Sequence, residues 1–304
     1  MIISCDQCQT RYRIKPELLK KPILKVRCSR CQHVFMVETN KKTPVELQKN
    51  DIVSNAQIIT ICNQKGGVAK TSTCINLGAA LAEQGKKVLL VDFDVLANLT
   101  LSLGYDKDVS FYQLVQMGQK SISQIIKKYS ENLWLLPSNK DMNLFPKYYM
   151  RKKGFEFLLK NQLKKISKGY DYILIDTPPS MEFFTLNALM AAELVIIPTQ
   201  CEYFSMNGVI EIEKIIKVLE QKYQYQLPYH LLISLFDSDN TAAKVILNQL
   251  NKQFKGKIFK TTIERDNKVQ EAQIMRKPVI NYAGNKSRAS QQYRALAKEV
   301  VTFQ

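Results

Sequence analysis

The segment from residue 57 to residue 85 constrains the fold more than any other part of this 304-residue chain. It begins with the apolar run QIITIC, passes through the glycine-rich stretch QKGGVAKTST, and ends with INLGAALAEQG, whose apolar residues recur at helical spacing. In α/β proteins, a buried strand that enters a helix through a glycine-rich loop forms a cradle for phosphate groups. The segment therefore predicts a parallel strand, a phosphate-binding loop and a helix, in that order.

The loop carries side chains suited to a nucleotide and its magnesium ion. Lys70 would neutralise the β- and γ-phosphate oxygens, and the Thr71 hydroxyl would ligate Mg²⁺. A second apolar run, YDYILIDTPPS, ends in Asp176, which would hold the metal through water. The residues expected to contact the nucleotide are Lys65, Gly66, Gly67, Val68, Ala69, Lys70, Thr71 and Ser72.

Further apolar runs repeat the strand pattern at intervals that leave room for helices. They are KVLLVDFD (87–94), LWLLPS (133–138), YDYILIDTPPS (170–180), ELVIIPTQ (193–200) and YHLLISLFD (229–237), with KIFKTTIE (257–264) as an expected edge strand. Strand–helix units in series predict an α/β class fold with a doubly wound, mostly parallel sheet. Ligands of such sheets bind at the carboxyl ends of the strands, where the glycine-rich loop and the aspartates would meet.

The N-terminal segment carries two C-x-x-C pairs, Cys5 with Cys8 and Cys28 with Cys31, separated by nineteen residues. Two tight turns that each present two thiolates suit a tetrahedral zinc site. The halves CDQCQTRYRI and CSRCQHVFMV also resemble each other, as in a zinc ribbon. The alternatives are four buried cysteines without metal, or a redox pair. The redox pair is disfavoured because no thioredoxin-like unit surrounds the cysteines.

These patterns predict a zinc-ribbon-like module at residues 1–37, a linker at 38–56 and a P-loop domain at 57–304. No apolar run is long enough to cross a bilayer and no signal-peptide core is present, so we expect a cytoplasmic protein. The net charge of +17 favours a polyanionic partner, nucleic acid or an anionic membrane surface, over a general lysine bias. Residues 1–50 carry eleven Lys/Arg against four acids, and whether the ribbon contacts nucleic acid or protein stays open.

Four stretches resemble the ParA/MinD family of deviant-Walker P-loop ATPases, and its ParA branch in particular. They are NQKGGVAKTST, KVLLVDFD, YDYILIDTPPSMEFFTLNALMAAELVIIPTQCEYFSMNGV and IFKTTIERDNKVQEAQIMRKPVINY. They run in family order and cover most of residues 57–300, while the ribbon lies outside the resemblance.

The resemblance implies a role for each matching residue. Lys65 matches the signature lysine that reaches across a nucleotide-sandwiched dimer to the ATP of the partner, and Asp94 matches the aspartate implicated in water activation. The implied catalytic set is Lys65, Lys70 and Asp94, and the implied magnesium set is Thr71, Asp92 and Asp176. The residues expected to bind DNA are Arg265, Lys268, Arg276 and Lys277, in the region that ParA-like proteins use for it.

The implied function is a slow ATPase switch. ATP would join two subunits, the dimer would bind DNA nonspecifically and associate with the nucleoid, and a ParB-like or other partner would stimulate hydrolysis. The outcome would be partitioning or positioning of a plasmid, chromosome or protein cargo. One alternative is a catalytically weak relative that acts as a scaffold or regulator. A MinD-like membrane ATPase is disfavoured, since the C-terminal SRASQQYRALAKEVVTFQ has the spacing of a packed core helix.

Three departures from the family pattern carry expectations of their own. Ala69 stands where the last loop glycine is usual, which bears on nucleotide affinity. Val95, Leu96 and Ala97 replace Pro-Gln-Gly after Asp94, which bears on the hydrolysis rate. Asp239 stands where DNA-binding relatives carry arginine, which bears on the strength of DNA binding.

Overall fold

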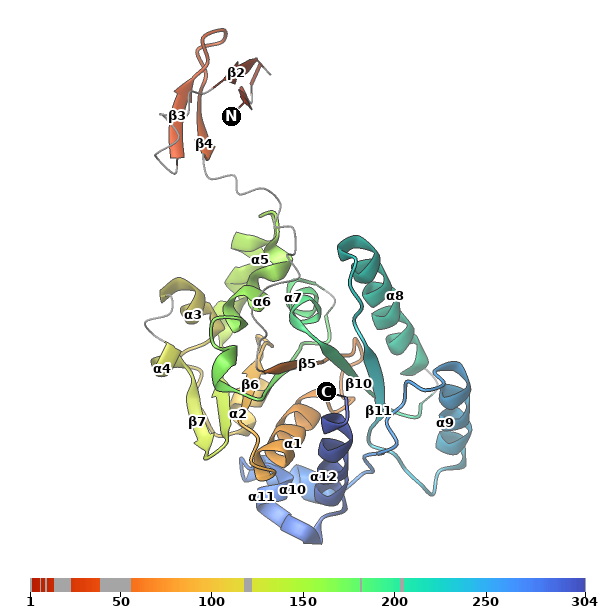
Figure 1. The fold of residues 1–304 in the computed structure, drawn as a ribbon. Helices are drawn as coiled ribbons and strands as arrows, with labels where there is room; N and C mark the ends of the chain where they lie inside the picture. Colours follow the sequence, from red (N-terminus) through yellow and green to blue (C-terminus); the bar gives the residue numbers. More distant parts are fainter. Residues whose placement is uncertain are drawn as a thin grey trace. The chain divides into compact units, whose positions relative to one another are not determined.

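A computed structural model describes residues 2–5, 7–8, 10–13, 23–38, 56–117, 122–180, 182–202 and 205–303. The chain divides into two compact units, Met1–Val53 and Ser54–Gln304 (Figure 1). Most of the expected linker, residues 39–55, lies outside the described residues, so the domain boundaries stay a prediction.

The smaller unit contains two antiparallel strand pairs. Strand β1 (Ile2–Ser4) pairs with β2 (Arg11–Arg13), and β3 (Ile23–Arg27) pairs with β4 (Val34–Glu38). Each C-x-x-C pair falls in the connection between the two strands of one pair. The internal resemblance of the two halves is therefore a structural repeat.

The larger unit is built on a seven-stranded sheet with the order β11-β10-β5-β9-β6-β8-β7. Its parallel strands are β5 (Gln57–Ile61), β6 (Val88–Asp92), β8 (Leu133–Leu136), β9 (Tyr172–Asp176), β10 (Leu194–Thr199) and β11 (Tyr229–Ile233). Strand β7 (Lys127–Ser130) adds an antiparallel edge. The predicted doubly wound, mostly parallel sheet is thus confirmed.

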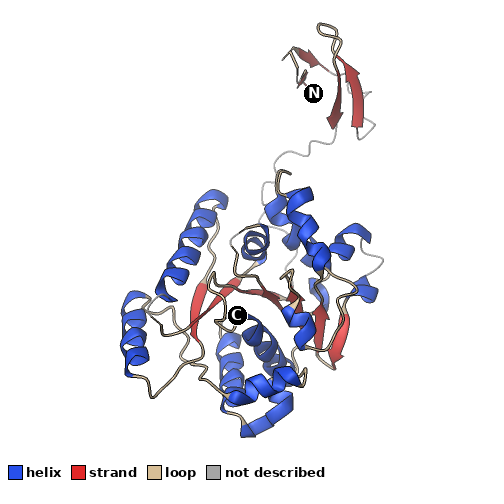
Figure 2. Ribbon diagram, turned by 180° about the vertical axis from the view of Figure 1, so that it is seen from behind, coloured by secondary structure: helices blue, strands red, loops and turns tan. Residues whose placement is uncertain are grey.

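Helices cover both faces of the sheet (Figure 2). On one face α1 (Lys70–Glu83), α11 (Val279–Ala283) and α12 (Arg288–Val301) share a core with strand residues such as Leu90 and Leu174. On the other face lie α3 (Phe111–Met117), α5 (Leu144–Tyr149), α6 (Leu158–Leu163), α7 (Phe183–Ala191), α8 (Ser205–Tyr223) and α9 (Thr241–Gln253). The remaining helices are α2 (Asn98–Ser102), α4 (Ile122–Ile125) and α10 (Asn267–Ile274). Alternate residues of each buried strand thus face opposite helical layers.

The expected edge strand at 257–264 is wrong. This segment runs beside β11 and past its end, with isolated bridges at Leu231–Ile258 and Phe236–Glu264 and a further backbone hydrogen bond from Ile263 to Ile233. Between them, the backbone N–H groups of Lys260 and Thr261 donate to the carboxylate of Glu299 on α12. The side chain of Glu299 takes the donors that a continuous ladder would need.

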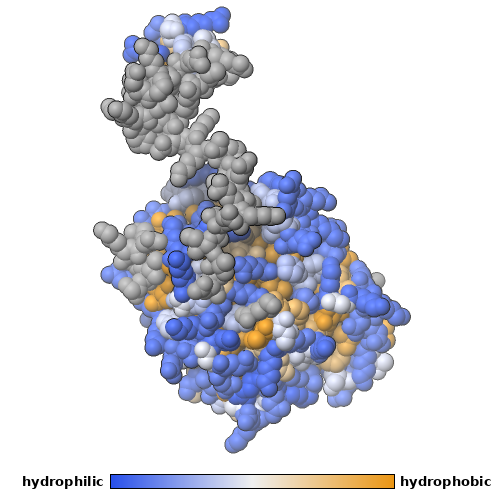
Figure 3. Space-filling view, in the orientation of Figure 1, coloured by the Kyte–Doolittle hydropathy of each residue, from blue (hydrophilic) through white to orange (hydrophobic). Residues whose placement is uncertain are grey.

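The visible face of the larger unit is predominantly hydrophilic, and its apolar residues form small separate groups (Figure 3). Among the described residues, no helix has the length and apolar character needed to cross a membrane.

Helix α1 packs directly on the sheet because Gly78 leaves room for it. A Cβ added at Gly78 would lie 2.5 Å from Cδ2 of Leu90, a buried side chain of β6. The approach aligns the helix that follows the glycine-rich loop with the strands that carry the aspartates.

We predict that Gly78→Val lowers the free energy of unfolding by about 1–3 kcal/mol, because the added methyl groups must displace Leu90. The matched control is Gly169→Val, at a site where an added Cβ meets no atom within 4 Å. Urea unfolding of both variants measures the difference, and equal stabilities would contradict the close packing of α1.

Candidate nucleotide site and zinc centre

The glycine-rich loop leaves β5 and enters α1 as the sequence predicts. Gly67 adopts a positive φ of 74°, and a Cβ added at Gly66 or Gly67 would meet no atom within 4 Å. The two glycines therefore face open space, with the N-terminus of α1 directly behind them. This is the arrangement that cradles a phosphate group.

Lys70 lies folded across the loop. Its Nζ donates to the backbone oxygen of Lys65 at 3.0 Å, and the side chain is largely buried. Burial lowers the pKa of Lys70, while the nearby carboxylate of Asp176 acts in the opposite direction. The ammonium is thus the positive charge closest to the cradle and to the buried aspartates.

Thr71 and Asp176 form the part of the site that fits a magnesium ion. The Thr71 hydroxyl donates to Oδ2 of Asp176 at 2.7 Å. The other oxygen of Asp176, Oδ1, is buried and has no hydrogen-bond partner. Burial first, and then the neighbouring charge of Asp92, raise the pKa of Asp176 well above its ordinary range. An orphaned carboxylate oxygen beside a threonine hydroxyl fits a hard cation such as Mg²⁺.

Asp92 contacts the segment between β6 and α2, residues 93–97, which is called here the switch segment. Its Oδ2 accepts from the backbone N–H of Thr100 at 2.8 Å and from the Thr100 hydroxyl at 2.6 Å. Its Oδ1 accepts from the backbone N–H of Asp94 at 3.2 Å. Burial raises the pKa of Asp92 to about 6, although these hydrogen bonds oppose the shift. Asp92 therefore anchors α2 and the switch, and its expected role as a magnesium ligand stays a prediction.

Asp94 is nearly buried and organises the turn into α2. Its Oδ1 accepts from the backbone N–H of Leu96 at 2.9 Å, and its backbone oxygen accepts from the hydroxyl of Ser138 at 2.5 Å. The backbone of the implied catalytic aspartate is thus tied to the end of β8.

Lys65 points away from its own cradle. Its Nζ lies 2.5 Å from Oε2 of Glu202, and it also donates to Oε1 of Gln200 at 3.3 Å and to the hydroxyl of Ser205 at 3.2 Å. Gln200 in turn donates to the backbone oxygen of Gly67 at 3.2 Å. The sequence did not assign roles to these three partners, although Gln200 and Glu202 lie in the quoted QCEY stretch.

Asn63 is a second residue whose role the sequence did not reveal. It is buried just ahead of the loop, donates to the backbone oxygen of Pro198 at 2.7 Å, and accepts from the backbone N–H of Lys65 at 3.0 Å. A Cβ added at Gly208 on α8 would lie 2.7 Å from Oδ1 of Asn63, so this amide is closely enclosed. Asn63 fixes the start of the loop to β10.

Two alanines of this site adopt the left-handed conformation. Ala69 has φ 65° and ψ 32°, and Ala97 has φ 57° and ψ 38°. Each is the residue that caps the N-terminus of a helix, α1 and α2 respectively. Both alanines stand where the family pattern has glycine. Because alanine is strained in the left-handed conformation, each of these two substitutions introduces backbone strain of about 1–2 kcal/mol.

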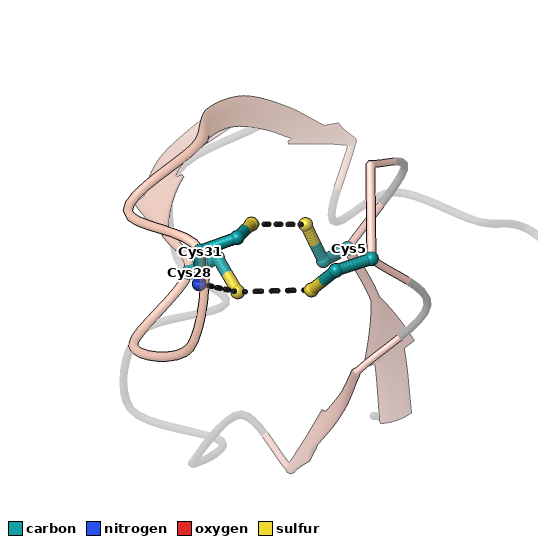
Figure 4. A group of neighbouring side chains, drawn as sticks. Cys5, Cys28 and Cys31 are labelled. Carbon is teal, nitrogen blue, oxygen red and sulfur yellow. Dashed lines mark hydrogen bonds between the residues drawn. The ribbon is translucent and has the colours of Figure 1, made fainter.

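The four N-terminal cysteines converge on one point (Figure 4). Their Sγ atoms all lie within 4.8 Å of one another, with 3.6 Å from Cys5 to Cys31 and 3.5 Å from Cys8 to Cys28. A tetrahedral site with Zn–S bonds of about 2.3 Å places sulfur atoms about 3.8 Å apart. The donor set is therefore that of a Cys₄ zinc site, and His33 is not part of it.

Tyr12 joins the two halves of this unit. Its hydroxyl lies 2.9 Å from Sγ of Cys28 and accepts from the backbone N–H of Ser29 at 3.1 Å. The aromatic residue of the first half thus closes the turn of the second, which explains its position after Cys8.

The other three cysteines are buried thiols of the larger unit. Burial raises the pKa of Cys62 to about 12, that of Cys201 to about 11, and that of Cys74 well above its ordinary range. All three pack in the core of this unit.

The residues expected to bind DNA gather at the ends of α10. Arg265, Arg276 and Lys277 are exposed, whereas Lys268 forms an ion pair of 2.7 Å with Glu271 on the same helix. Gln273 donates to the hydroxyl of Ser72 at 3.0 Å, so α10 lies beside the phosphate loop.

Comparison with known proteins agrees with this geometry. A family model described as an AAA domain matches residues 56–229, and one described as a zinc-ribbon domain matches residues 1–36. Sporulation initiation inhibitor protein Soj of Bacillus subtilis is 36% identical over 255 residues, 81% of this chain and 98% of Soj. Chromosome-partitioning ATPase Soj of Treponema pallidum is 35% identical over 80% of this chain and 96% of that protein. The chain belongs to the ParA/Soj family of P-loop ATPases.

A solved relative is cobyrinic acid a,c-diamide synthase from Mycobacterium smegmatis with bound ATP analog and magnesium. It is 32% identical with a TM-score of 0.70, over 81% of this chain and 94% of that chain. A plasmid partition protein from Borrelia burgdorferi is 26% identical with a TM-score of 0.65, over 82% and 99%. The predicted ParA-type domain and N-terminal zinc ribbon are thus confirmed. Because the relatives carry names of different activities, the ParA-type fold alone does not define the function.

We predict that the purified chain carries about one zinc ion, and that Cys28→Ser loses most of it because three thiolates bind zinc more weakly than four. Cys74→Ala is the control, since this cysteine lies in the core of the other unit. Metal analysis of the wild type without zinc would contradict the Cys₄ site, as would full retention by Cys28→Ser.

We predict that Ala69→Gly and Ala97→Gly each raise the free energy of unfolding by about 1 kcal/mol, because glycine adopts positive φ without strain. The same exchange inside α1, Ala79→Gly, should lower it by about 1 kcal/mol. Denaturant unfolding compares the signs. Destabilisation by all three exchanges would contradict the strained caps, and ATP affinity measured alongside shows whether Ala69 also detunes nucleotide binding.

Proposed function

We propose that this protein is a ParA-like ATPase that dimerises on ATP, binds DNA nonspecifically, and partitions or positions a plasmid, chromosome or protein cargo. The cofactors are ATP with Mg²⁺ in the P-loop domain and Zn²⁺ in the ribbon. The ATP-bound form would associate with the nucleoid, and a ParB-like or other partner would stimulate a slow hydrolysis.

The placement of the two loop lysines carries this proposal. Lys70 already lies over the cradle of its own subunit, so the loop has no need of a second lysine there. Lys65 is turned outward and bound to Glu202, with a side chain that is 31% exposed. A lysine held ready beside the phosphate site but directed away from it fits a role in the site of a second copy.

Within one subunit, different residues would bind the phosphates, hold the metal and orient the attacking water. The loop N–H groups and Lys70 bind the β- and γ-phosphates, and Thr71 with Asp176 holds the metal. Bound Mg²⁺ would offset the negative charge of the phosphates. Asp94 orients the attacking water from a backbone fixed by Ser138.

The environment of α10 supports DNA as the partner. Arg276 adopts a left-handed φ of 55° at the end of α10, a conformation in which glycine costs less. Lys277 donates its backbone N–H to the oxygen of Ala272, as in a helix-ending motif. Arg276 is exposed and forms no ion pair with any acid in the described part of the chain, so strain retained there supports a role for its side chain. Asp239 lies apart from α10, at the turn before α9.

The second candidate is a catalytically weak relative that acts as a scaffold. The left-handed Ala69 and Ala97 favour it, because strain at the loop and at the switch can slow turnover. The preserved set of Lys65, Lys70 and Asp94 favours the ATPase.

The test is binding of duplex DNA in the presence of ATP and of ADP. We expect the wild type to bind DNA more tightly with ATP than with ADP, and Lys65→Ala to lose this difference. The affinity of Lys65→Ala for ATP itself should change less than about 2-fold, well below the 10-fold change that corresponds to 1.4 kcal/mol. Lys214→Ala is the control because this lysine pairs on the surface of α8. Equal binding with ATP and ADP in the wild type would refute the switch.

Glu202→Gln tests the role of Lys65 by removing the carboxylate that pairs with it in this structure. Because the pair with Glu202 must break before Lys65 can reach a partner subunit, its loss should favour the ATP-bound dimer. A partly exposed ion pair contributes about 0–1 kcal/mol, so dimerisation should tighten by up to about 5-fold. Sedimentation with ATP measures this, and weaker dimerisation would show that Glu202 serves the dimer instead.

A further inference from the structure

The segment Lys140–Lys168, called here the basic platform, concentrates positive charge on the larger unit. Nine basic residues against two acidic ones give it a net charge of +7 in 29 residues. It spans η3 (Lys140–Asn143), α5, η4 (Phe155–Phe157), α6 and η5 (Ser167–Gly169). The basic residues are Lys140, Lys147, Arg151, Lys152, Lys153, Lys160, Lys164, Lys165 and Lys168.

The two acids of the platform do not offset this charge at the surface. Asp141 accepts a hydrogen bond from Nε2 of Gln113 at 2.7 Å. Glu156 is nearly buried, accepts from the hydroxyl of Tyr223, and lies 3.6 Å from Nζ of Lys222 on α8. Both acids are therefore engaged with partners on other elements.

The elements of the platform pack against the core of the larger unit. The Phe183 ring on α7 lies between Phe145 of α5 and Phe155 of η4, stacked at centroid distances of 5.8 Å and 5.7 Å. Leu159 and Leu163 of α6 are fully buried in the same core. The charges thus project from packed elements, and less conformational entropy is lost when they bind a ligand.

Four exposed charges of the platform have no acidic partner among the residues that the structure describes. Lys147, Arg151, Lys153 and Lys168 are exposed, and no acidic side chain in the described part of the chain lies within ion-pair distance of them. On other helices some of the basic residues are paired: Arg294 lies 2.6 Å from Glu83, and Lys268 lies 2.7 Å from Glu271. The platform therefore presents positive charge that the fold itself does not neutralise.

We propose that the basic platform binds the phosphate backbone of nucleic acid. Repeated unpaired Lys and Arg on a rigid surface match the regular negative charges of a duplex. Tyr148, with 59% of its surface exposed, and Asn161 add hydrogen-bonding groups among these charges. An anionic membrane fits less well, because Phe145, Leu159 and Leu163 are buried in the core, and the exposed large hydrophobic side chains of this segment are limited to Tyr148 and Met150.

This surface is separate in sequence and in element from the α10 residues of the proposed function. The inference rests on that function for its DNA partner, but it does not need the ATP-bound dimer, because one subunit carries the whole platform. The platform would supply affinity for DNA that is independent of nucleotide.

The test uses the full chain with ADP and a short fluorescent duplex of mixed sequence. The platform variant combines Lys147→Gln, Arg151→Gln, Lys153→Gln and Lys168→Gln. The matched control combines Lys252→Gln, Lys255→Gln, Lys260→Gln and Lys298→Gln, which removes the same charge from exposed positions elsewhere. Unchanged thermal unfolding shows that both variants fold.

We expect the platform variant to bind DNA about 10-fold more weakly, and the slope of log affinity against log salt to shrink by about 3, since each lost phosphate contact contributes about 0.9. The control should change affinity less than about 2-fold, because removal of distant charge affects only the overall field. If both variants lost DNA affinity equally, the effect would depend on net charge alone, and the proposal would be overturned.

Vesicles containing phosphatidylglycerol distinguish the other polyanion. Loss of vesicle binding with unchanged DNA binding in the platform variant would assign the surface to membranes and overturn the proposal. Failure of the proposed function has a different signature, because it is read from the ATP-to-ADP ratio of the wild type. The platform variant should keep that ratio while both affinities fall.

Discussion

The two buried carboxylates at the centre of the sheet are the constraint on which the site depends. Asp92 and Asp176 lie opposite each other on the paired strands β6 and β9 and are almost completely buried. Two like charges at this depth are unfavourable unless hydrogen bonds and cations offset them. Thr100 and Thr71 supply hydrogen bonds, Lys70 supplies a positive charge, and Oδ1 of Asp176 is still unsatisfied. The loop, the switch and a metal ion are therefore interdependent parts of one electrostatic arrangement.

Non-glycine residues with positive φ occur near this edge of the sheet at Ala69, Ala97 and Arg276, and also at Leu235 after β11. The alanine side chains have no polar group to contribute, so their effect must act through the backbone. Alanine restricts the unfolded chain more than glycine does, and it stiffens the caps of α1 and α2 at the cost of strain. Arg276 differs because its exposed guanidinium can act on a ligand. The strain at the alanines thus bears on the expected speed and affinity of the nucleotide site, and that at Arg276 bears on the proposed contact with DNA.

The sequence predicted the features that lie in continuous stretches. The buried parallel strands are apolar runs, and the loop with Lys70, Thr71 and Asp176 is readable because each motif adjoins its own strand. Strand β7 has no such signal, because its polar sequence KKYS is held by pairing with β8 and by contacts with Tyr105, which is distant in sequence.

The partners of Lys65 and the role of Asn63 were also beyond the sequence. They depend on β10 lying beside β5, which brings together segments more than 100 residues apart. Likewise, the left-handed conformation of the caps of α1 and α2 is set by the path of the backbone and not by the alanine side chains. The sequence therefore shows Ala69 only as a departure from the family pattern.

The distribution of charge along the chain favours the proposed polyanion partner over a general lysine bias. The basic platform carries a net charge of +7, and the eleven basic and four acidic residues of 1–50 give another +7, of +17 for the whole chain. The remaining three-quarters of the sequence therefore carries a net charge of only +3, and several of its exposed lysines and arginines pair with acids, as on α8, α10 and α12. A composition bias would spread the excess over every surface. Concentration in two segments, one of them on packed elements of the larger unit, is therefore consistent with the proposed binding of phosphate groups.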